Sequence, residues 1–297
     1  MASLNTLTLN SDSNGDPVAH AYTITITDNS VNAGELNVLD SKTSVDLVVD
    51  NATNITGTLA QVKAAYVASD AGNPTIKAAS FGNETVTISD TEIIAADLQI
   101  VDTATSGVIT LSGITKVTGT ATEIHTLMDS AGVTGLTNAN TSIVITGTAA
   151  ETVDLVAIEA HTTAHGLITL DPSTTAVKGA LADVNTVFTK STATSSFTPT
   201  IVGPLTANVT LDEGDNTALS YTVAEINGVM GKTTGLVTAT VTDNNTDNQD
   251  NDIDALLGAR ITGASDVTDR TLSEDGHAIS VRVHNESNGQ ALSAEKL

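Results

Sequence analysis

The stretch Ile26-Thr-Asp-Asn-Ser-Val-Asn-Ala-Gly-Glu-Leu-Asn-Val-Leu-Asp40 recurs twice along the chain, as Ile88–Asp102 and as Ile145–Glu159. A second signature follows each copy in the same order: Ile55–Val62, Val117–Ile124 and Val177–Val184. The period is roughly 60 residues, and self-similarity of this kind is typical of repeat proteins, in which each unit buries its apolar edge against the next.

The repeats predict how the chain is divided. A degenerate fourth copy, Ala224–Thr238, follows the pattern of Ala96–Thr110, and His277–Val283 resembles His20–Ile26. Pro199–Pro204 interrupts the pattern and is the predicted linker, with a boundary near Thr200. The predicted organisation is an N-terminal capping strand in 1–22 (strand residues Leu4 to Leu9), repeats in 23–84, 85–140 and 141–200, a degenerate repeat with an Asn/Asp-rich loop in 201–276, and a partial repeat or tail in 277–297.

Within a unit, short strands alternate with short helices. Apolar and polar residues alternate in Thr85–Ile88 and in Gly107–Leu111, and many of them are β-branched, which predicts strands. Helices are predicted after Asp90 and after Thr120, because apolar residues there are three and four positions apart. Thr120 with Glu123, and Thr58 with Gln61, have the spacing of a capping box. Each unit is therefore predicted to form two strand-plus-helix coils of about 30 residues. The predicted fold is a β-rich α/β repeat protein, an elongated solenoid-like array; the alternative is a string of small β-sandwich-like modules.

Composition excludes several classes of function. The 297 residues include three Phe, three Tyr and no Trp, so the core must be built from small aliphatic side chains in thin layers. This disfavours an ordinary catalytic domain, and we expect no enzyme. The formal net charge of −24 repels phosphate backbones and anionic membranes, so we expect neither nucleic-acid binding nor membrane insertion.

The N-terminal sequence and the absence of cysteine add two expectations. Met1–Asn10 has no basic segment followed by an apolar one, so no standard export signal is expected. No run of 18 apolar residues occurs, which disfavours a membrane span. With no cysteine, the chain has no disulfide, thiolate metal site or cysteine nucleophile.

The Asn/Asp run from Asp243 to Asp254 is the candidate metal site. Oxygen-bearing side chains stand at positions one, three, five and twelve of an EF-hand-like spacing: Asp243, Asn245, Asp247 and Asp254. Hard oxygen ligands at alternating positions suit Ca²⁺. Asn248 replaces the usual turn glycine, and Asp254 is shorter than the usual bidentate Glu. A flexible solvated loop is therefore the competing interpretation. Asp212–Asp215 is a weaker candidate of the same type, and no other cofactor is expected.

Three further patterns have a structural explanation beside the functional one. His161 and His165 have the i, i+4 spacing of a zinc-binding helix face, but the repeat alignment places them in a surface turn. Gly228–Thr233 resembles the end of a phosphate-binding loop, although the alignment again indicates a turn. Asp97 and Glu123 are candidate catalytic carboxylates only if they lie in a pocket, and solvated acidic faces are the favoured interpretation.

The repeat signatures carry a resemblance. Ile-Thr-Asp or Ile-Ser-Asp, then Ala-x-Asp-Leu or Gly-Glu-Leu, then Thr-Gly-Thr-x-x-x-Val or Ile, are similar to the repeats of cyanobacterial surface (RTX-associated) proteins and of structural proteins from marine cyanophages. The resemblance covers roughly residues 20–200. It implies exposure and assembly or adhesion and supplies no catalytic residue. The glycine-aspartate calcium nonapeptides of the secreted relatives are absent from this chain.

Together these observations give the expected function. The chain is expected to be a non-enzymatic virion structural protein of a cyanobacterial phage, an exposed fibre, appendage or capsid-decoration subunit at the virion surface. Its expected partners are further copies of itself in a homo-oligomer, other virion structural proteins, or the host surface. The alternative is a calcium-stabilised adhesin repeat protein of the extracellular bacterial cell surface, exported by type I secretion. A glycan depolymerase is disfavoured by the scarcity of aromatic residues for stacking on sugars.

Overall fold

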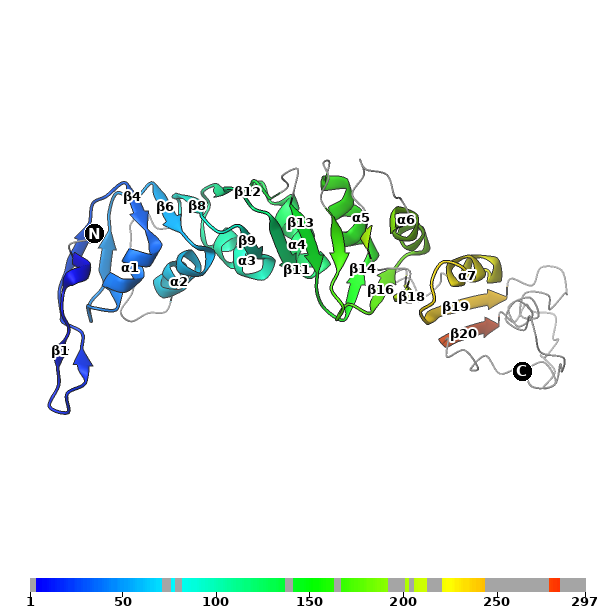
Figure 1. Cartoon of the computed structure of the whole chain (residues 1–297), viewed down its shortest axis with the longest axis horizontal. Coiled ribbons are helices and arrows are strands. Elements are labelled where there is room, and N and C mark those ends of the chain that lie inside the picture. The colour runs from blue at the N-terminus through cyan, green and yellow to red at the C-terminus, as the bar shows by residue number, and fades with distance from the viewer. Residues whose placement is uncertain are drawn as a thin grey trace. The chain divides into compact units, whose positions relative to one another are not determined.

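The computed structural model describes residues 4–70, 76–77, 82–136, 141–162, 167–191, 201–202, 206–212, 221–243 and 278–283 (Figure 1). These residues form an α/β fold with several mostly parallel sheets and, within the described ranges, seven α-helices. The chain divides into two compact units. Unit 1 comprises Met1–Ile145, Ile158–Ile168 and Ser196–Pro199, and unit 2 comprises Thr146–Ala157, Thr169–Ser195 and Thr200–Leu297.

Two parallel sheets of unit 1 run through successive segments of the chain. The first has the order β3-β5-β7, formed by Ile24–Ile26, Leu47–Val49 and Ile76–Lys77. The second has the order β4-β6-β8-β10-β12, formed by Ser30–Asn32, Asn54–Gly57, Thr85–Ile88, Ile109–Leu111 and Val133–Thr134. The strands β9 (Glu92–Ile94), β11 (Lys116–Gly119) and β13 (Ser142–Ile145) pair in parallel in the same way. Parallel neighbours require a long crossover between them, and here each crossover returns the chain to the next strand of the same sheet.

The register of these strands aligns buried apolar residues in a ladder. Val31 pairs with Ile55, Ile55 with Val86, Val86 with Ile109, and Ile109 with Val133. The first four of these side chains are completely buried. Successive rungs are separated by 24, 31, 23 and 24 residues, so three of the four segments are shorter than the predicted coil of about 30 residues. Each segment contributes one aliphatic side chain at the equivalent position of the core. The chain can therefore build a packed core with few aromatic residues.

Four helices of unit 1 follow the strands. They are α1 (Ala33–Asp40), α2 (Leu59–Asp70), α3 (Ala95–Ala104) and α4 (Ala121–Asp129). Each contacts the next, α1 with α2, α2 with α3, and α3 with α4 (Figure 1). Three of them bury the same positions of their sequence, an initial alanine and the residues three and six places later: Ala33, Leu36 and Leu39; Ala95, Leu98 and Val101; Ala121, Ile124 and Leu127. The repeat in the sequence is therefore a repeat of buried positions.

Both predicted capping boxes are confirmed. The Thr120 hydroxyl accepts from the Glu123 amide at 3.3 Å, and the Glu123 carboxylate accepts from the Thr120 amide at 2.9 Å. Thr58 and Gln61 make the same reciprocal pair, at 3.3 and 3.0 Å. Each box satisfies amides that the first turn of a helix leaves without a helical acceptor. A third box, Thr222 with Glu225, begins α7 (Val223–Met230).

We expect Thr120→Ala to lower the free energy of unfolding by about 1 kcal/mol, because the Glu123 amide loses its capping acceptor. The matched control is Thr126→Ala in the same helix. Its exposed hydroxyl donates to the Thr122 carbonyl at 2.7 Å, and alanine is the better helix former, so the change is expected to be neutral or slightly stabilising. Urea denaturation followed by circular dichroism measures both changes. Equal effects of the two substitutions would contradict the assigned role of the box.

The N-terminal segment corrects one prediction. The capping strand expected over Leu4 to Leu9 is wrong, because Leu4–Thr6 forms a 3-10 turn closed by the Leu7 amide bonding to the Leu4 carbonyl at 3.0 Å. The Lys42 ammonium donates to the carbonyls of Asn5 and Leu7. In a sheet, the backbone amides of a neighbouring strand would form hydrogen bonds with such carbonyls. The short strands β1 (Asn10–Ser11) and β2 (Pro17–Val18) pair antiparallel, and the Gly15 amide bonds to the Asp12 carbonyl in the turn between them.

Unit 2 contains a parallel sheet of order β14-β16-β18-β19-β20. Its strands are Ala149–Glu151, Ala176–Gly179, Asn208–Leu211, Val237–Asp243 and Ala278–Val283. The register again joins apolar residues, Ala150 to Val177, Val177 to Val209, and Val209 to Val237. The helices α6 (Leu181–Ser191) and α7 contact each other. The remaining described elements are α5 (Thr152–His161), β15 (Ile168–Leu170) and β17 (Ile201–Val202).

Candidate functional site

The calcium candidates lie at the edge of the described chain. Asp243 is the last residue of β19 and is paired in register with Val283 of β20. Asn245, Asp247 and Asp254 lie outside the described residues, as do three residues of the weaker candidate Asp212–Asp215. The calcium site therefore stays a prediction, and the structure places Asp243 at the end of a strand.

The segment Gly228–Thr233 does not have the form of a phosphate-binding loop, because Gly228–Met230 are the last residues of α7 and the turn begins at Gly231. A phosphate-binding lysine stands where a helix begins, whereas Lys232 and Thr233 follow the end of α7. The Lys232 ammonium donates to the Asn185 side chain at 2.6 Å, and the buried Thr233 hydroxyl donates to the Ala207 carbonyl at 2.7 Å. Both groups that would contact a nucleotide are therefore engaged in holding the turn.

The two candidate carboxylates also have structural partners. Asp97 of α3 accepts from the Lys63 ammonium of α2 at 2.5 Å, with both side chains about one-third exposed. Glu123 is held by the capping box described above. Asp97 therefore ties one helix to the next, and Glu123 fixes the start of its own helix. The interpretation of both as surface groups agrees with these contacts.

A turn built around a buried threonine recurs where a helix leads into the next strand. The Thr105 hydroxyl donates to the carbonyl of Glu84, 21 residues earlier, and accepts from the Gly107 amide, both at 3.0 Å. Thr233 makes the equivalent pair of bonds with the Ala207 carbonyl, at 2.7 Å, and the Gly235 amide, at 2.9 Å. Thr43 does the same with Tyr22 and Val45. In each of these three turns, the threonine thus supplies a hydrogen bond to the preceding segment.

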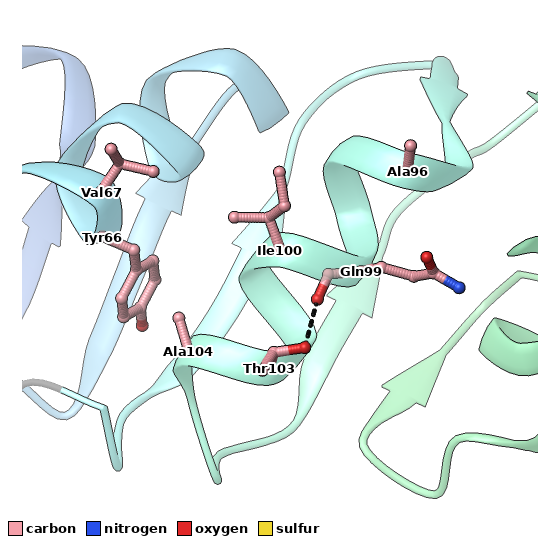
Figure 2. Close-up of a pocket in the computed structure, with 7 residues that line it drawn as sticks. All are labelled: Tyr66, Val67, Ala96, Gln99, Ile100, Thr103 and Ala104. Atoms are coloured by element: carbon pink, nitrogen blue, oxygen red, sulfur yellow. Dashed lines mark hydrogen bonds between the residues drawn. The ribbon is translucent and has the colours of Figure 1, made fainter. Parts of the chain in front are cut away.

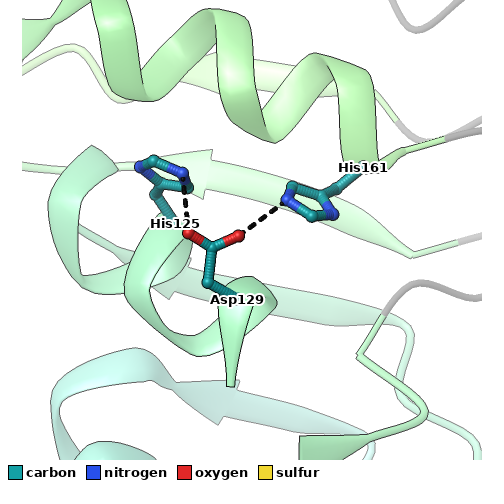
Figure 3. Close-up of side chains that lie close together, drawn as sticks. All are labelled: His125, Asp129 and His161. Carbon is teal, nitrogen blue, oxygen red and sulfur yellow. Dashed lines mark hydrogen bonds and ion pairs between the residues drawn. The ribbon is translucent and has the colours of Figure 1, made fainter. Parts of the chain in front are cut away.

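His161 is the last residue of α5, and His165 lies outside the described residues. The His161 Nε2 is 2.9 Å from the Asp129 Oδ1 of α4. The other carboxylate oxygen of Asp129 is 3.2 Å from the Nε2 of His125, one helical turn earlier. Figure 3 shows the carboxylate of Asp129 between the two imidazoles. All three side chains belong to unit 1.

Sequence reasoning missed His125 and Asp129. Their i, i+4 spacing, which places them on one face of α4, was the available local signal. Their neighbour His161 stands far beyond them in the sequence and on another helix, so the cluster requires the packing of two different helices. From the sequence, only the spacing between equivalent helices of consecutive repeats indicates that α4 and the end of α5 could bring these residues together.

A shallow pocket of about 380 Å³ lies between α2 and α3. Tyr66 and Val67 contribute from α2, and Gln99, Ile100 and Thr103 contribute from α3 (Figure 2). The Thr103 hydroxyl donates to the Gln99 carbonyl at 2.8 Å, so it is engaged within its own helix. The residues that line the pocket include no carboxylate, imidazole or amine, and we assign no reaction to it.

Within the described residues, none of the helices is long and apolar enough to cross a bilayer. Comparison of the chain with known protein families, with curated proteins and with solved structures found no match.

Proposed function

We propose that the chain is a non-enzymatic structural protein of a cyanobacterial phage particle, an exposed fibre, appendage or capsid-decoration subunit that acts through assembly and surface contact. In this proposal its segments stack as the coils of a solenoid-like array. The single observation that carries the proposal is the parallel ladder of buried aliphatic residues in unit 1, to which each successive segment contributes one rung.

The ladder supports stacking for a physical reason. A segment of this size cannot bury its own apolar edge, whereas each added neighbour buries one more edge and extends the same core. Parallel pairing also disfavours the alternative of β-sandwich modules, which are built from antiparallel sheets. The contacts between helices of successive segments in unit 1 support the proposed stacking.

The polar groups of the described chain support the same role. The hydroxyls of Thr43, Thr105 and Thr233 each bond a turn to the preceding segment, and ion pairs join neighbouring strands and helices. Lys116 lies 3.0 Å from Glu92 across two paired strands, and Lys178 lies 3.3 Å from Glu151 in the same relation. Surface pairs of this kind contribute at most about 1 kcal/mol each, so their effect is chiefly to fix the register between segments.

Exposed apolar side chains on the helices support association with other copies or proteins. Val38 of α1, Val67 of α2 and Ile100 of α3 are 45, 48 and 40 % exposed. They stand on three helices that contact one another in order. If these side chains meet a partner, their burial would favour association, and symmetric homo-oligomers are the common form of such assemblies.

The test is quantitative peptide mass spectrometry of density-purified phage particles beside a washed surface extract of uninfected cyanobacterial cells. High copy number in the particles is the expected result. Recovery only from the uninfected cell surface would overturn the proposal and favour the calcium-stabilised adhesin. Light scattering of the purified chain adds a second check, because a monodisperse monomer that does not bind particles contradicts assembly.

A further inference from the structure

The cluster of His125, Asp129 and His161 has the composition of a transition-metal site. We infer that these three side chains bind a divalent late first-row transition metal, for which Zn²⁺ is the natural probe. The inference is independent of the virion role, because it concerns metal binding by three side chains and not assembly. Figure 3 shows the three side chains converging from these two helices.

The spacing of the three ligand atoms suits such an ion. Zn²⁺ bonds imidazole nitrogen and carboxylate oxygen at about 2.0–2.2 Å, which puts neighbouring ligand atoms of a tetrahedral site about 3.3 Å apart. The Asp129 oxygens are 2.9 and 3.2 Å from the two Nε2 atoms, and all three ligand atoms lie within 4.8 Å of one another. The side chains of His125, Asp129 and His161 are 26, 58 and 41 % exposed, and binding of the ion requires the two nitrogens to lie about 3.3 Å apart.

The fold holds the ligands without help from the ion. Ile124 and Leu127, on the buried face of α4, fix the orientation of the face that carries His125 and Asp129. Directly after His161, the buried Thr162 hydroxyl donates to the carbonyls of Ile158 and Glu159, at 2.9 and 3.0 Å, and so ties the end of α5 to its last turn. The three ligands therefore stand on helical residues of unit 1, two on α4 and one at the last position of α5.

The ligand set also determines which ions are accepted. Two imidazoles favour Zn²⁺, Co²⁺, Ni²⁺ or Cu²⁺, whereas Ca²⁺ takes oxygen ligands and gains nothing from histidine. Three protein ligands leave a fourth position of a tetrahedral site for water or an incoming ligand, and the partial exposure of all three side chains makes that position accessible. The net charge of −24 favours the approach of any cation.

The experiment is isothermal titration of the full chain with Zn²⁺, with Co²⁺ absorption as an independent readout of the ligand geometry. The wild-type chain is expected to bind Zn²⁺, to gain thermal stability with it, and to show the intense visible bands of tetrahedral Co²⁺. His161→Gln, His125→Gln and Asp129→Asn should each weaken Zn²⁺ binding about ten- to a hundredfold, since even the loss of an outer-shell partner has effects of that size. Ca²⁺ should not compete.

The matched controls are His20→Gln and His165→Gln. His20 stacks on Tyr22 in another part of unit 1, and its substitution should leave Zn²⁺ binding unchanged. His165→Gln distinguishes the proposed site from the His161–His165 pair suggested by the sequence. If His125→Gln and Asp129→Asn bind Zn²⁺ as tightly as the wild type, the proposed site is overturned, and weakening by His165→Gln instead would assign the metal to the histidine pair. Circular dichroism of each variant checks that the substitution leaves the fold intact.

Discussion

Gly235→Ala is expected to lower the free energy of unfolding by about 1–3 kcal/mol, the usual range for overpacking a filled site. Gly235 follows Thr233 in the turn that leads into β19. A Cβ at this position would overlap with the carbonyl oxygen of Ala207 and would lie 2.7 Å from the Asn208 amide nitrogen. Both are backbone atoms of the preceding segment, so relief of the overlap requires the two segments to separate.

The matched control is Gly228→Ala, earlier in the chain and within α7. No atom lies within 4 Å of a Cβ at Gly228, and alanine is the better helix former, so a stabilisation of about 0.5–1 kcal/mol is expected. Gly107→Ala repeats the test in unit 1, where the added Cβ would overlap with the Glu84 carbonyl. Thermal and urea unfolding measure all three. If Gly235→Ala and Gly107→Ala are as stable as the wild type, the turns do not bring the segments into close contact.

Tyr66→Phe is expected to destabilise the chain by about 1–3 kcal/mol, because it removes a hydrogen-bond donor from a buried carboxylate. Glu84 is only 3 % exposed and accepts from the Tyr66 hydroxyl and from the amides of Gly82 and Asn83, at 2.8 and 3.0 Å. Without the tyrosine, a buried negative charge keeps its backbone donors but loses the hydroxyl. Tyr22→Phe is the control, since Tyr22 is 40 % exposed.

The same pair predicts a dependence of stability on alkaline pH. Burial raises the pKa of Tyr66, and the hydrogen bond to Glu84 and the negative charge of that carboxylate raise it further. Above about pH 10 the unfolded chain loses the tyrosine proton while the folded chain keeps it. The contribution of protonated Tyr66 to the free energy of unfolding is therefore fully present below about pH 10 and decreases as the pH rises further. Urea denaturation between pH 8 and pH 11 should show a steeper fall for the wild type than for Tyr66→Phe, and parallel curves would contradict the buried pair.

Local features of the fold were predictable from the sequence where they depend on nearby residues. The predicted strand Thr85–Ile88 coincides with β8, and both capping boxes form, because alternation and an i, i+3 pair are satisfied within a few residues. Leu4 to Leu9 also alternates, but the carbonyls of Asn5 and Leu7 are bound by the distant Lys42, and no strand forms there. The sequence pattern around those residues contains no sign of that partner.

The candidate sites were less predictable because they depend on contacts between segments. Asp97 and Glu123 were recognisable as surface acids, but the partner of Asp97 is Lys63 of another helix. The sequence suggested a metal for His161 through its neighbour His165, whereas the structure places His161 beside Asp129. The strand register determines which segments are adjacent. The register depends on all the buried residues of the ladder, so the partners of Asp97 and His161 could not be read from nearby residues.

In our proposal, consecutive segments are equivalent stacked coils. Removal of a whole coil should therefore disrupt the fold less than removal of half a coil. Deletion of residues 92–115, the full-coil deletion, joins Thr91 to Lys116, so that β8 can pair with β12 and α2 can contact α4. Deletion of residues 92–103, the half-coil deletion, removes β9 and most of α3, and leaves the following strands out of register.

The most direct measurement is thermal unfolding of these two deletion variants beside the wild type, followed by circular dichroism. We expect the full-coil deletion to unfold in a cooperative transition at a somewhat lower temperature, since it loses one coil and its interfaces. The half-coil deletion should lose most of the folded signal of unit 1. Equal disruption by both deletions, or better tolerance of the half-coil deletion, would contradict the stacked-coil account.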